Sequence, residues 1–407
     1  MEWISQNKEL FGVLMMPFTY GFVGWLTNMV ALKMTFYPLE FWGIPPYLGW
    51  QGIIPRKAYK MASKAVDVIT ERLLKIEEVF DQIDPRMVER ELKPMLTKVG
   101  EEITRDIMDD LNPNLWKILP ESAQNEFIKQ SQNETGKSIE KIITEIRANI
   151  YTVFDLKGLV LKSLTGPNVA LTVHMFKSVG APEFRFIELS GLYFGFLLGL
   201  VQMGIWTIFP EWWTLPIQGV IVGYLTNFLA LNMIFRPLRP RKFGPFTYQG
   251  LFLKRQDEVS KSYAHLVASH ILTPANIMEQ ILYGKAADEI FGIVQKTVAS
   301  AVDKTANLAK PVISFAVGSE RYDQMKKYAV AKMTNLIPES SKKLEEYFEQ
   351  AMDLENTMYD RMRKLEPEEF EAILRTAFQE DEFLLILIGA ALGAAVGLGQ
   401  GLYMVSV

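Results

Sequence analysis

The 407-residue sequence contains no cysteine, which excludes disulfides, thiolate nucleophiles and cysteine-ligated zinc or iron–sulfur sites. Its three histidines, His174, His265 and His270, are not spaced for a shared metal, because positions 265 and 270 align poorly on a helix. No P-loop, dinucleotide-binding glycine fingerprint or GxSxG motif occurs. We therefore expect a protein that is not an enzyme and that uses no cofactor or metal.

The sequence also lacks an excess of positive charge. Its 43 Lys and Arg residues are balanced by 47 Asp and Glu residues, so a nucleic-acid partner is not expected. Hydrophobic residues make up 49% of the chain and are concentrated in a few blocks, which are separated by stretches rich in Lys, Glu, Asp and Gln. This segregation is typical of membrane spans joined by polar regions. No Asp, Glu or Arg lies deep in a block, so charge-coupled pumping has no evident carrier.

Four of the apolar blocks approach the length of about 20 residues that a helix needs to cross the hydrocarbon core. They are residues 11–36, 187–209, 215–235 and 383–405. The alternative, helices buried in a soluble core, would have to occur four times at spanning length. We therefore predict an all-α integral membrane protein with four transmembrane helices and two mostly helical soluble segments, residues 57–183 and 251–382.

The distribution of basic residues at the span ends predicts the orientation. The flanks that face the soluble segments contain Arg56, Lys57 and Arg236 among other cations, whereas the connection 210–214 contains no Lys or Arg. Because basic flanks mark the cytoplasmic side, we predict that both soluble segments are cytoplasmic and that both termini lie outside.

The two halves of the chain resemble each other. Residues 24–39 match residues 223–238 at ten of sixteen positions, at an offset of 199. The second span of each half repeats as well, at an offset of 198. A self-similarity of this kind indicates a tandem duplication. We predict two repeat units, residues 1–209 and 210–407, which are parallel because each unit leaves and returns to the same side.

Small residues recur at four-residue spacing on the second span of each repeat, on one helix face. They are Gly191, Gly195 and Gly199 in the first repeat and Gly389, Gly393 and Gly397 in the second. Such stripes let helix backbones approach closely in membranes. We predict that they pack against the small residues of the first spans.

Uncharged polar residues also lie within the predicted spans: Thr27, Asn28 and Gln202 in the first repeat, and Thr226, Asn227 and Gln400 in the second. They either line a site for an ion, a proton or a lipid headgroup, or form interhelical hydrogen bonds worth about 1 kcal/mol each. At about 1.5 Å per residue, Asn28 lies about 12 Å deep and Gln202 about 22 Å deep, so we do not expect these two amides to pair.

Stretches rich in proline, glycine and aromatic residues follow the first span of each repeat, at residues 37–52 and 236–250. We interpret them as loops that lie in, or re-enter, the headgroup layer. Arg56 and Lys57 follow the first loop, and Lys254 and Arg255 follow the second. These cations are candidates for binding lipid phosphates, or they serve only as positive-inside topology signals.

The soluble segments have the pattern of amphipathic helices, with apolar residues at three- and four-residue spacing in residues 58–76. Such helices must bury their apolar stripes. The partners are the other soluble segment, which we favour, a second subunit, or the membrane surface.

The motif Gly24-Trp-Leu-Thr-Asn28, the run Gly52-Ile-Ile-Pro-Arg-Lys57 and the glycine-rich ending with Gln400 resemble the YheB/YjiN-like family of bacterial membrane proteins. The second half departs from this pattern where Pro55 is replaced by Leu253. The resemblance implies a location in the bacterial cytoplasmic (inner) membrane, or in thylakoid-type membranes of cyanobacterial relatives. It implies no reaction, ligand or catalytic residue, because none is established for the family.

Two functions fit these observations. In the first, the protein handles or transports membrane lipids, is a homo-oligomer, and has polar intramembrane sites beside headgroup-binding loops. In the second, it is a membrane-anchored helical scaffold whose soluble helices recruit protein partners or organise the envelope. An apolar groove among the soluble helices favours the first function, and a closed, well-packed bundle favours the second.

Overall fold

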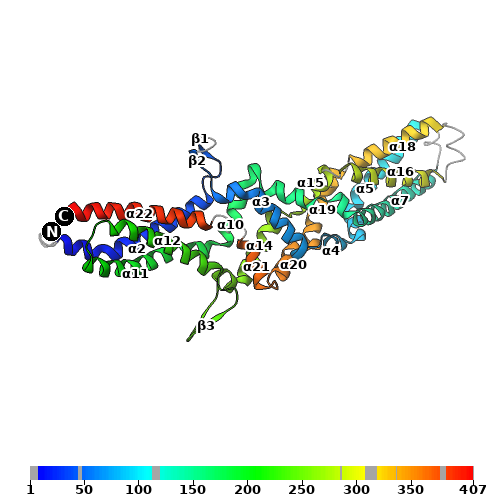
Figure 1. The fold of residues 1–407 in the computed structure, drawn as a ribbon. Helices are drawn as coiled ribbons and strands as arrows, with labels where there is room; N and C mark the ends of the chain where they lie inside the picture. The colour runs from blue at the N-terminus through cyan, green and yellow to red at the C-terminus, as the bar shows by residue number, and fades with distance from the viewer. Residues whose placement is uncertain are drawn as a thin grey trace. The chain divides into compact units, whose positions relative to one another are not determined.

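The computed structural model describes residues 8–44, 48–111, 120–284, 287–307, 319–335, 337–375 and 382–406. The protein is mostly helical, as predicted, and divides into two compact units (Figure 1). The membrane unit comprises Met1–Ile69, Leu161–Leu266 and Met358–Val407. The helical unit comprises Thr70–Val160 and Val267–Thr357. Each unit therefore combines segments from both halves of the sequence.

Four helices of the membrane unit are long and apolar enough to cross a bilayer: α2 (Lys8–Phe36), α11 (Ala181–Ile208), α12 (Thr214–Phe235) and α22 (Glu382–Ser406). This confirms the four apolar helices expected from the sequence. Helix α11 begins six residues before the predicted start at Ile187. A proline in its first turn favours helix initiation, so the helix continues past the apolar block into charged residues.

The long helices form two close pairs, α2 with α11 and α12 with α22. Glycines lie at both contacts. A β-carbon at Gly191 would overlap the backbone of Gly24, and one at Gly389 would approach the backbone of Gly223. The other predicted stripe glycines, Gly195, Gly199, Gly393 and Gly397, likewise face the backbone of the partner helix. Because lipid tails are as apolar as the helices, this close backbone approach is a main source of attraction.

A short antiparallel hairpin follows the first helix of each pair. Strands β1 (Trp42–Ile44) and β2 (Leu48–Trp50) follow α2, and β3 (Arg241–Phe243) and β4 (Phe246–Tyr248) follow α12. The sequence predicts loops at these positions, and the short strands are a difference from that prediction. Prolines follow the ends of both helices, and Gly244, with a positive φ, permits the reversal of the chain between β3 and β4. We refer to this end of the four helices as the hairpin end.

Shorter helices complete the membrane unit beside the hairpin end: α3 (Ile53–Val68), α10 (Val169–Val179), α13 (Leu251–Lys254), α14 (Gln256–His270) and α21 (Pro367–Arg375). Helix α3 packs on α2 and α10, and α13 packs on α12 and α21. Four elements cross between the units: α14 itself, together with η1 (Ile69–Leu73), α9 (Leu156–Leu164) and α20 (Leu354–Met362).

The helical unit contains helices from both predicted soluble segments. They are α4 (Ile76–Asp81), α5 (Pro85–Leu111), α7 (Glu121–Ala148) and α8 (Ile150–Val153) from the first, and α15 (Pro274–Tyr283), α16 (Ala287–Asn307), α18 (Ser319–Thr334) and α19 (Ile337–Met352) from the second. Helix α7 packs on α5 and α16, and α19 packs on α5 and α15. The two segments therefore bury their apolar stripes against each other.

An ion pair at the surface reinforces this packing. Lys332 Nζ of α18 donates to Asp106 Oδ2 of α5 at 2.7 Å and also contacts Glu102. The hydrogen bonds from Lys332 and Tyr328 hold the pKa of the Asp106 carboxyl below its usual range. The Asp106 carboxylate therefore stays ionised, and its ion pair intact, at a more acidic pH than an unpaired aspartate would allow.

The glycine contacts predict the effect of a larger side chain at the helix interface. A β-carbon at Gly393 would overlap the backbone carbonyl of Gly219, so Gly393→Leu must push α12 and α22 apart. We expect a loss of about 1–3 kcal/mol in stability, measured by thermal unfolding of the purified protein in detergent. Gly399→Leu on the same helix is the control, because no atom lies within 4 Å of a β-carbon there. Equal effects of the two substitutions would contradict the packing.

Candidate functional site

The buried asparagines of the membrane unit each join two long helices. Asn28 Nδ2 on α2 donates to the backbone oxygen of Ile187 on α11 at 2.6 Å. Asn227 Nδ2 on α12 makes the same kind of bond to the oxygen of Leu385 on α22, at 2.7 Å. Both asparagines are buried. Their amide N–H groups are therefore used to connect the helices of each pair.

The neighbouring threonines bond within their own helices. Thr27 Oγ1 donates to the oxygen of Gly24 at 3.0 Å, and Thr226 Oγ1 donates to that of Gly223 at 3.4 Å. The amide oxygens of Asn28 and Asn227 are buried without a hydrogen-bond partner among the residues that the structure describes. These four side chains are thus occupied mainly with helix contacts, and only the two amide oxygens remain available to a ligand.

A small cavity of about 20 Å³ lies beside Asn227 and is lined by residues of all four long helices. Its walls include Thr35, Ile187 and Leu385. Ile187 and Leu385, whose backbone oxygens accept the asparagine hydrogen bonds, therefore both line this cavity. A cavity of about 10–15 Å³ holds one water molecule. The space therefore admits a water but no lipid headgroup.

Gln202 lies apart from the asparagines, further along α11. Its side chain is buried, and neither of its amide atoms has a partner within the described parts of the chain. The indole nitrogen of Trp206, one turn later, is in the same situation. The amide oxygen of Gln400 on α22 is also buried without a described partner. The structure thus does not bring the glutamines and asparagines into one site.

The four predicted headgroup-binding cations differ in their surroundings. Arg56 and Lys254 are exposed, and Lys57 is partly exposed. Arg255 instead donates to the buried carboxylate of Glu183 at 2.6 Å and to Glu258 at 2.8 Å. Burial lowers the pKa of Arg255, but these two carboxylates outweigh it and raise the pKa above its ordinary value. Arg255 therefore joins α13 and α14 to the start of α11.

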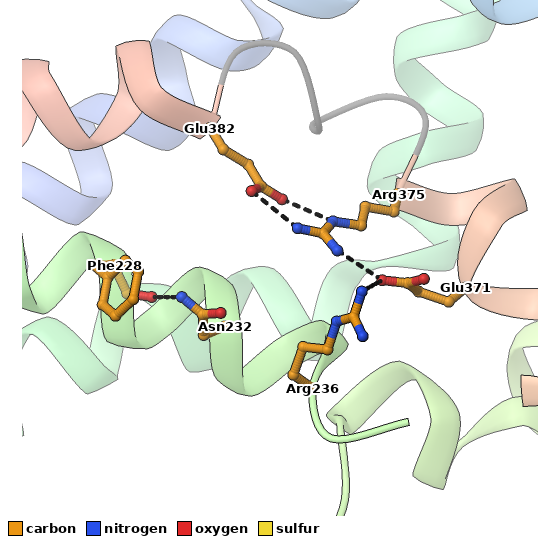
Figure 2. A network of polar contacts seen from close by, with 6 residues as sticks. All are labelled: Phe228, Asn232, Arg236, Glu371, Arg375 and Glu382. Carbon is orange, nitrogen blue, oxygen red and sulfur yellow. Dashed lines mark hydrogen bonds and ion pairs between the residues drawn. The ribbon is translucent and has the colours of Figure 1, made fainter. Parts of the chain in front are cut away.

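A second group of ion pairs lies at the hairpin end, and the sequence analysis missed it. Figure 2 shows Glu371 of α21 between two arginines. Arg236, directly after α12, contacts Glu371 at 3.4 Å, and Arg375 contacts it at 3.0 Å. Arg375 also bonds both carboxylate oxygens of Glu382 at the start of α22. The hydrogen bonds to Glu382 raise the pKa of Arg375 against the opposing effect of burial.

The helical unit contains a partly open cavity of about 180 Å³, which was not expected from the sequence. Its walls come from both soluble segments, including Leu92 and Ile143 of the first and Val294, Leu344 and Phe348 of the second. Its lining is almost wholly aliphatic and aromatic, and the exceptions are Ser138 and Arg147. The guanidinium of Arg147 is bound to the backbone oxygens of Phe80, Asp81 and Ile83 at the end of α4.

No cluster of metal-binding side chains is found in the described residues, where His, Asp and Glu nowhere gather in groups of three or more. The cavity of the helical unit offers no carboxylate or imidazole. Its chemistry is therefore that of apolar contact, which suits a hydrocarbon chain.

The asparagine bonds predict a structural effect of their removal. We expect Asn28→Ala and Asn227→Ala each to lower stability by about 0.6–1.7 kcal/mol, and the double variant to leave lipid binding unchanged. Thermal unfolding and lipid retention of the purified variants test this. Asn232→Ala is the control, because its amide bonds Phe228 within its own helix. Wild-type stability with loss of lipid binding would instead identify the amides as a ligand site.

Comparisons with known proteins give partial matches. Residues 217–343 match the family model described as "Protein of unknown function (DUF445)". A UPF0754 membrane protein of Bacillus pumilus is 39% identical over 111 residues, which cover 26% of this chain and 28% of the relative. One from Bacillus cereus is 30% identical over 176 residues, or 40% of this chain and 44% of the relative. No solved structure matches.

These matches cover less than half the length of either relative. They do not confirm the YheB/YjiN name. The printed names describe membrane proteins of bacteria and state no activity, in agreement with the four long apolar helices of this chain. The chain is therefore similar to the uncharacterised DUF445 and UPF0754 membrane proteins.

Proposed function

We propose that the protein is a non-enzymatic, lipid-handling membrane protein that binds the acyl chain of a membrane lipid in its helical unit. The observation that carries this proposal is the apolar cavity of about 180 Å³ between α5, α7, α16 and α19. An apolar cavity of about 150 Å³ in another protein stays free of water and binds benzene. The cavity here is partly open, and its size and apolar lining are suited to a segment of a hydrocarbon chain.

The attachment of this unit to a membrane selects a lipid as the ligand. The chain of the helical unit continues directly into four helices that can span a bilayer. Membrane lipids are thus the most abundant apolar molecules available to a protein with such helices. Exposed cations at Arg56 and Lys254, after the hairpins, are suited to contact lipid phosphates, so headgroup and acyl chain have separate candidate sites.

A tandem duplication accounts for the paired contacts of the membrane unit. Asn28 donates to Ile187 in the first half, and Asn227 donates to Leu385 in the second half. The two donors are 199 residues apart in the sequence, and the two acceptors are 198 residues apart. An equivalent hydrogen bond occurs at the base of each hairpin: Gln51 donates to the oxygen of Leu39, and Gln249 donates to the oxygen of Leu238. We infer two parallel repeats, 1–209 and 210–407, in the cytoplasmic membrane of a bacterium.

The packing of the two soluble segments bears on their sidedness. Helix α7 of the first segment contacts α16 of the second, so both segments must lie on the same side of the membrane. The basic flanks at the hairpin end favour a cytoplasmic location for that side, with both termini outside. Four spans are few for a carrier, so we propose a homo-oligomer if lipids cross the membrane.

A scaffold is the second candidate function. It is favoured by the asparagine amides, which serve helix contacts, and by the glycine contacts, which close each helix pair. In that case the soluble helices bind protein partners, and the cavity is a packing defect without a ligand.

The two functions predict different results when the cavity is filled. Ile143→Trp on α7 places a larger side chain in the wall of the cavity. We expect the substitution to remove co-purifying lipid, which native mass spectrometry detects. We also expect it to lower the affinity for a fluorescent fatty acid about tenfold, which corresponds to about 1.4 kcal/mol of binding free energy. The mass spectrum also gives the number of subunits.

Thr144→Trp is the matched control, because Thr144 is the next residue of the same helix and is exposed. It should retain lipid. Val294→Trp fills the cavity from the other segment and should act like Ile143→Trp. If the wild-type protein carries no lipid and binds no fatty acid, the scaffold is the better account.

A further inference from the structure

The β1–β2 hairpin exposes large apolar side chains. Trp42 is 78% exposed, Ile44 is 71% exposed and Leu48 is 74% exposed. Single apolar residues are common on protein surfaces, but three of this size together on one short hairpin are not. An isolated two-stranded hairpin is also marginal in water. The hairpin therefore needs an apolar partner.

The strand register places these side chains on one face. Trp42 is opposite Trp50, and Ile44 is opposite Leu48. Opposed residues and alternate residues of paired strands share a face, so all four side chains point the same way. The opposite face carries the pair Gly43 and Gly49, which have no side chains. The ring of Phe41 lies against Gly49 on that opposite face, so the exposed apolar side chains of the strands themselves gather on one face of the hairpin.

The base of the hairpin is tied to the end of α2. Trp50 Nε1 donates to the oxygen of Met34 at 3.1 Å, and Gln51 Nε2 donates to that of Leu39 at 2.8 Å. The backbone N–H of Gly52 donates to the oxygen of Pro38 at 2.9 Å. These bonds hold the hairpin beside the point where α2 leaves the apolar layer. Figure 1 shows it projecting sideways from the four long helices.

We propose that the β1–β2 hairpin is an interfacial membrane anchor that inserts Trp42, Ile44 and Leu48 into the boundary between headgroups and acyl chains, while Trp50 packs on the protein and ties the hairpin to α2. Tryptophan prefers this layer because it has an apolar ring and a polar N–H group. A membrane is favoured over a protein partner because the hairpin starts at the end of a spanning helix and is bonded to it. This inference is independent of lipid binding in the helical unit.

The second hairpin has a different character that fits the same surface. Arg241 and Lys242 of β3 are exposed, and Tyr248 of β4 is partly exposed at 38%. Cations near a membrane surface are attracted to anionic headgroups, at a depth shallower than the acyl chains. The first hairpin therefore supplies apolar insertion and the second supplies attraction to the anionic surface.

A depth measurement tests the anchor in the full chain. Because the protein contains no cysteine, Ile44→Cys can be labelled at a single position with an environment-sensitive fluorophore. The labelled protein is placed in nanodiscs with or without lipids that carry a doxyl quencher near the top of the acyl chain. We expect a blue-shifted emission, loss of most of that emission with doxyl lipid, and little quenching by aqueous iodide.

Tyr283→Cys is the control, because Tyr283 is 67% exposed in the helical unit. Its label should respond to iodide and not to doxyl lipid. Leu48→Cys provides a second label position if Ile44→Cys does not fold. Quenching of the hairpin label by iodide alone would overturn the anchor. Protection from both quenchers would also overturn it, since the face would then be covered by protein, such as a second copy of the chain.

Discussion

The membrane unit depends on the close approach of helix backbones inside a medium that offers no hydrogen bonds. In hydrocarbon, the hydrophobic effect does not drive helices together, so contact area and buried polar bonds must do so. Glycines at the contacts of α2 with α11 and of α12 with α22 let the backbones meet. That approach brings Asn28 and Asn227 within bonding distance of carbonyl oxygens on the partner helix. The glycines and the asparagine therefore act together in each helix pair: the glycines allow the close contact, and the asparagine makes a hydrogen bond across it.

The close contact within each helix pair also constrains the rest of the chain. Each helix pair fixes where its hairpin begins and where its soluble segment starts and returns. At the hairpin end, ion pairs continue the connection outside the apolar layer, with Arg255 bound to Glu183 and Arg236 and Arg375 bound to Glu371. The soluble segments then meet in the helical unit, where their apolar stripes leave a cavity between them. The proposed acyl-chain site is this cavity, and it forms only because both soluble segments contribute residues to its lining.

The sequence predicts much of this arrangement because its strongest signals are physical necessities. Apolar runs of spanning length mark the four long helices, and the glycines at four-residue spacing mark the faces along which these helices pack. Other features depend on contacts between distant residues. Nothing local links Glu371 to Arg236, and the strands of the hairpins are too short, at three residues each, to show an alternating pattern. The cavity likewise results from imperfect packing between helices far apart in sequence.

The central claim is that two pairs of spanning helices hold both soluble segments on one side of the bilayer. Single cysteines at Tyr151 and Tyr283 test it directly, since these residues are 72% and 67% exposed and lie in the first and second segment. Labelling with a membrane-impermeant maleimide in intact cells and in inverted vesicles gives the side of each. The account predicts that both positions are labelled only in inverted vesicles. Labelling of the two positions from opposite sides would contradict it.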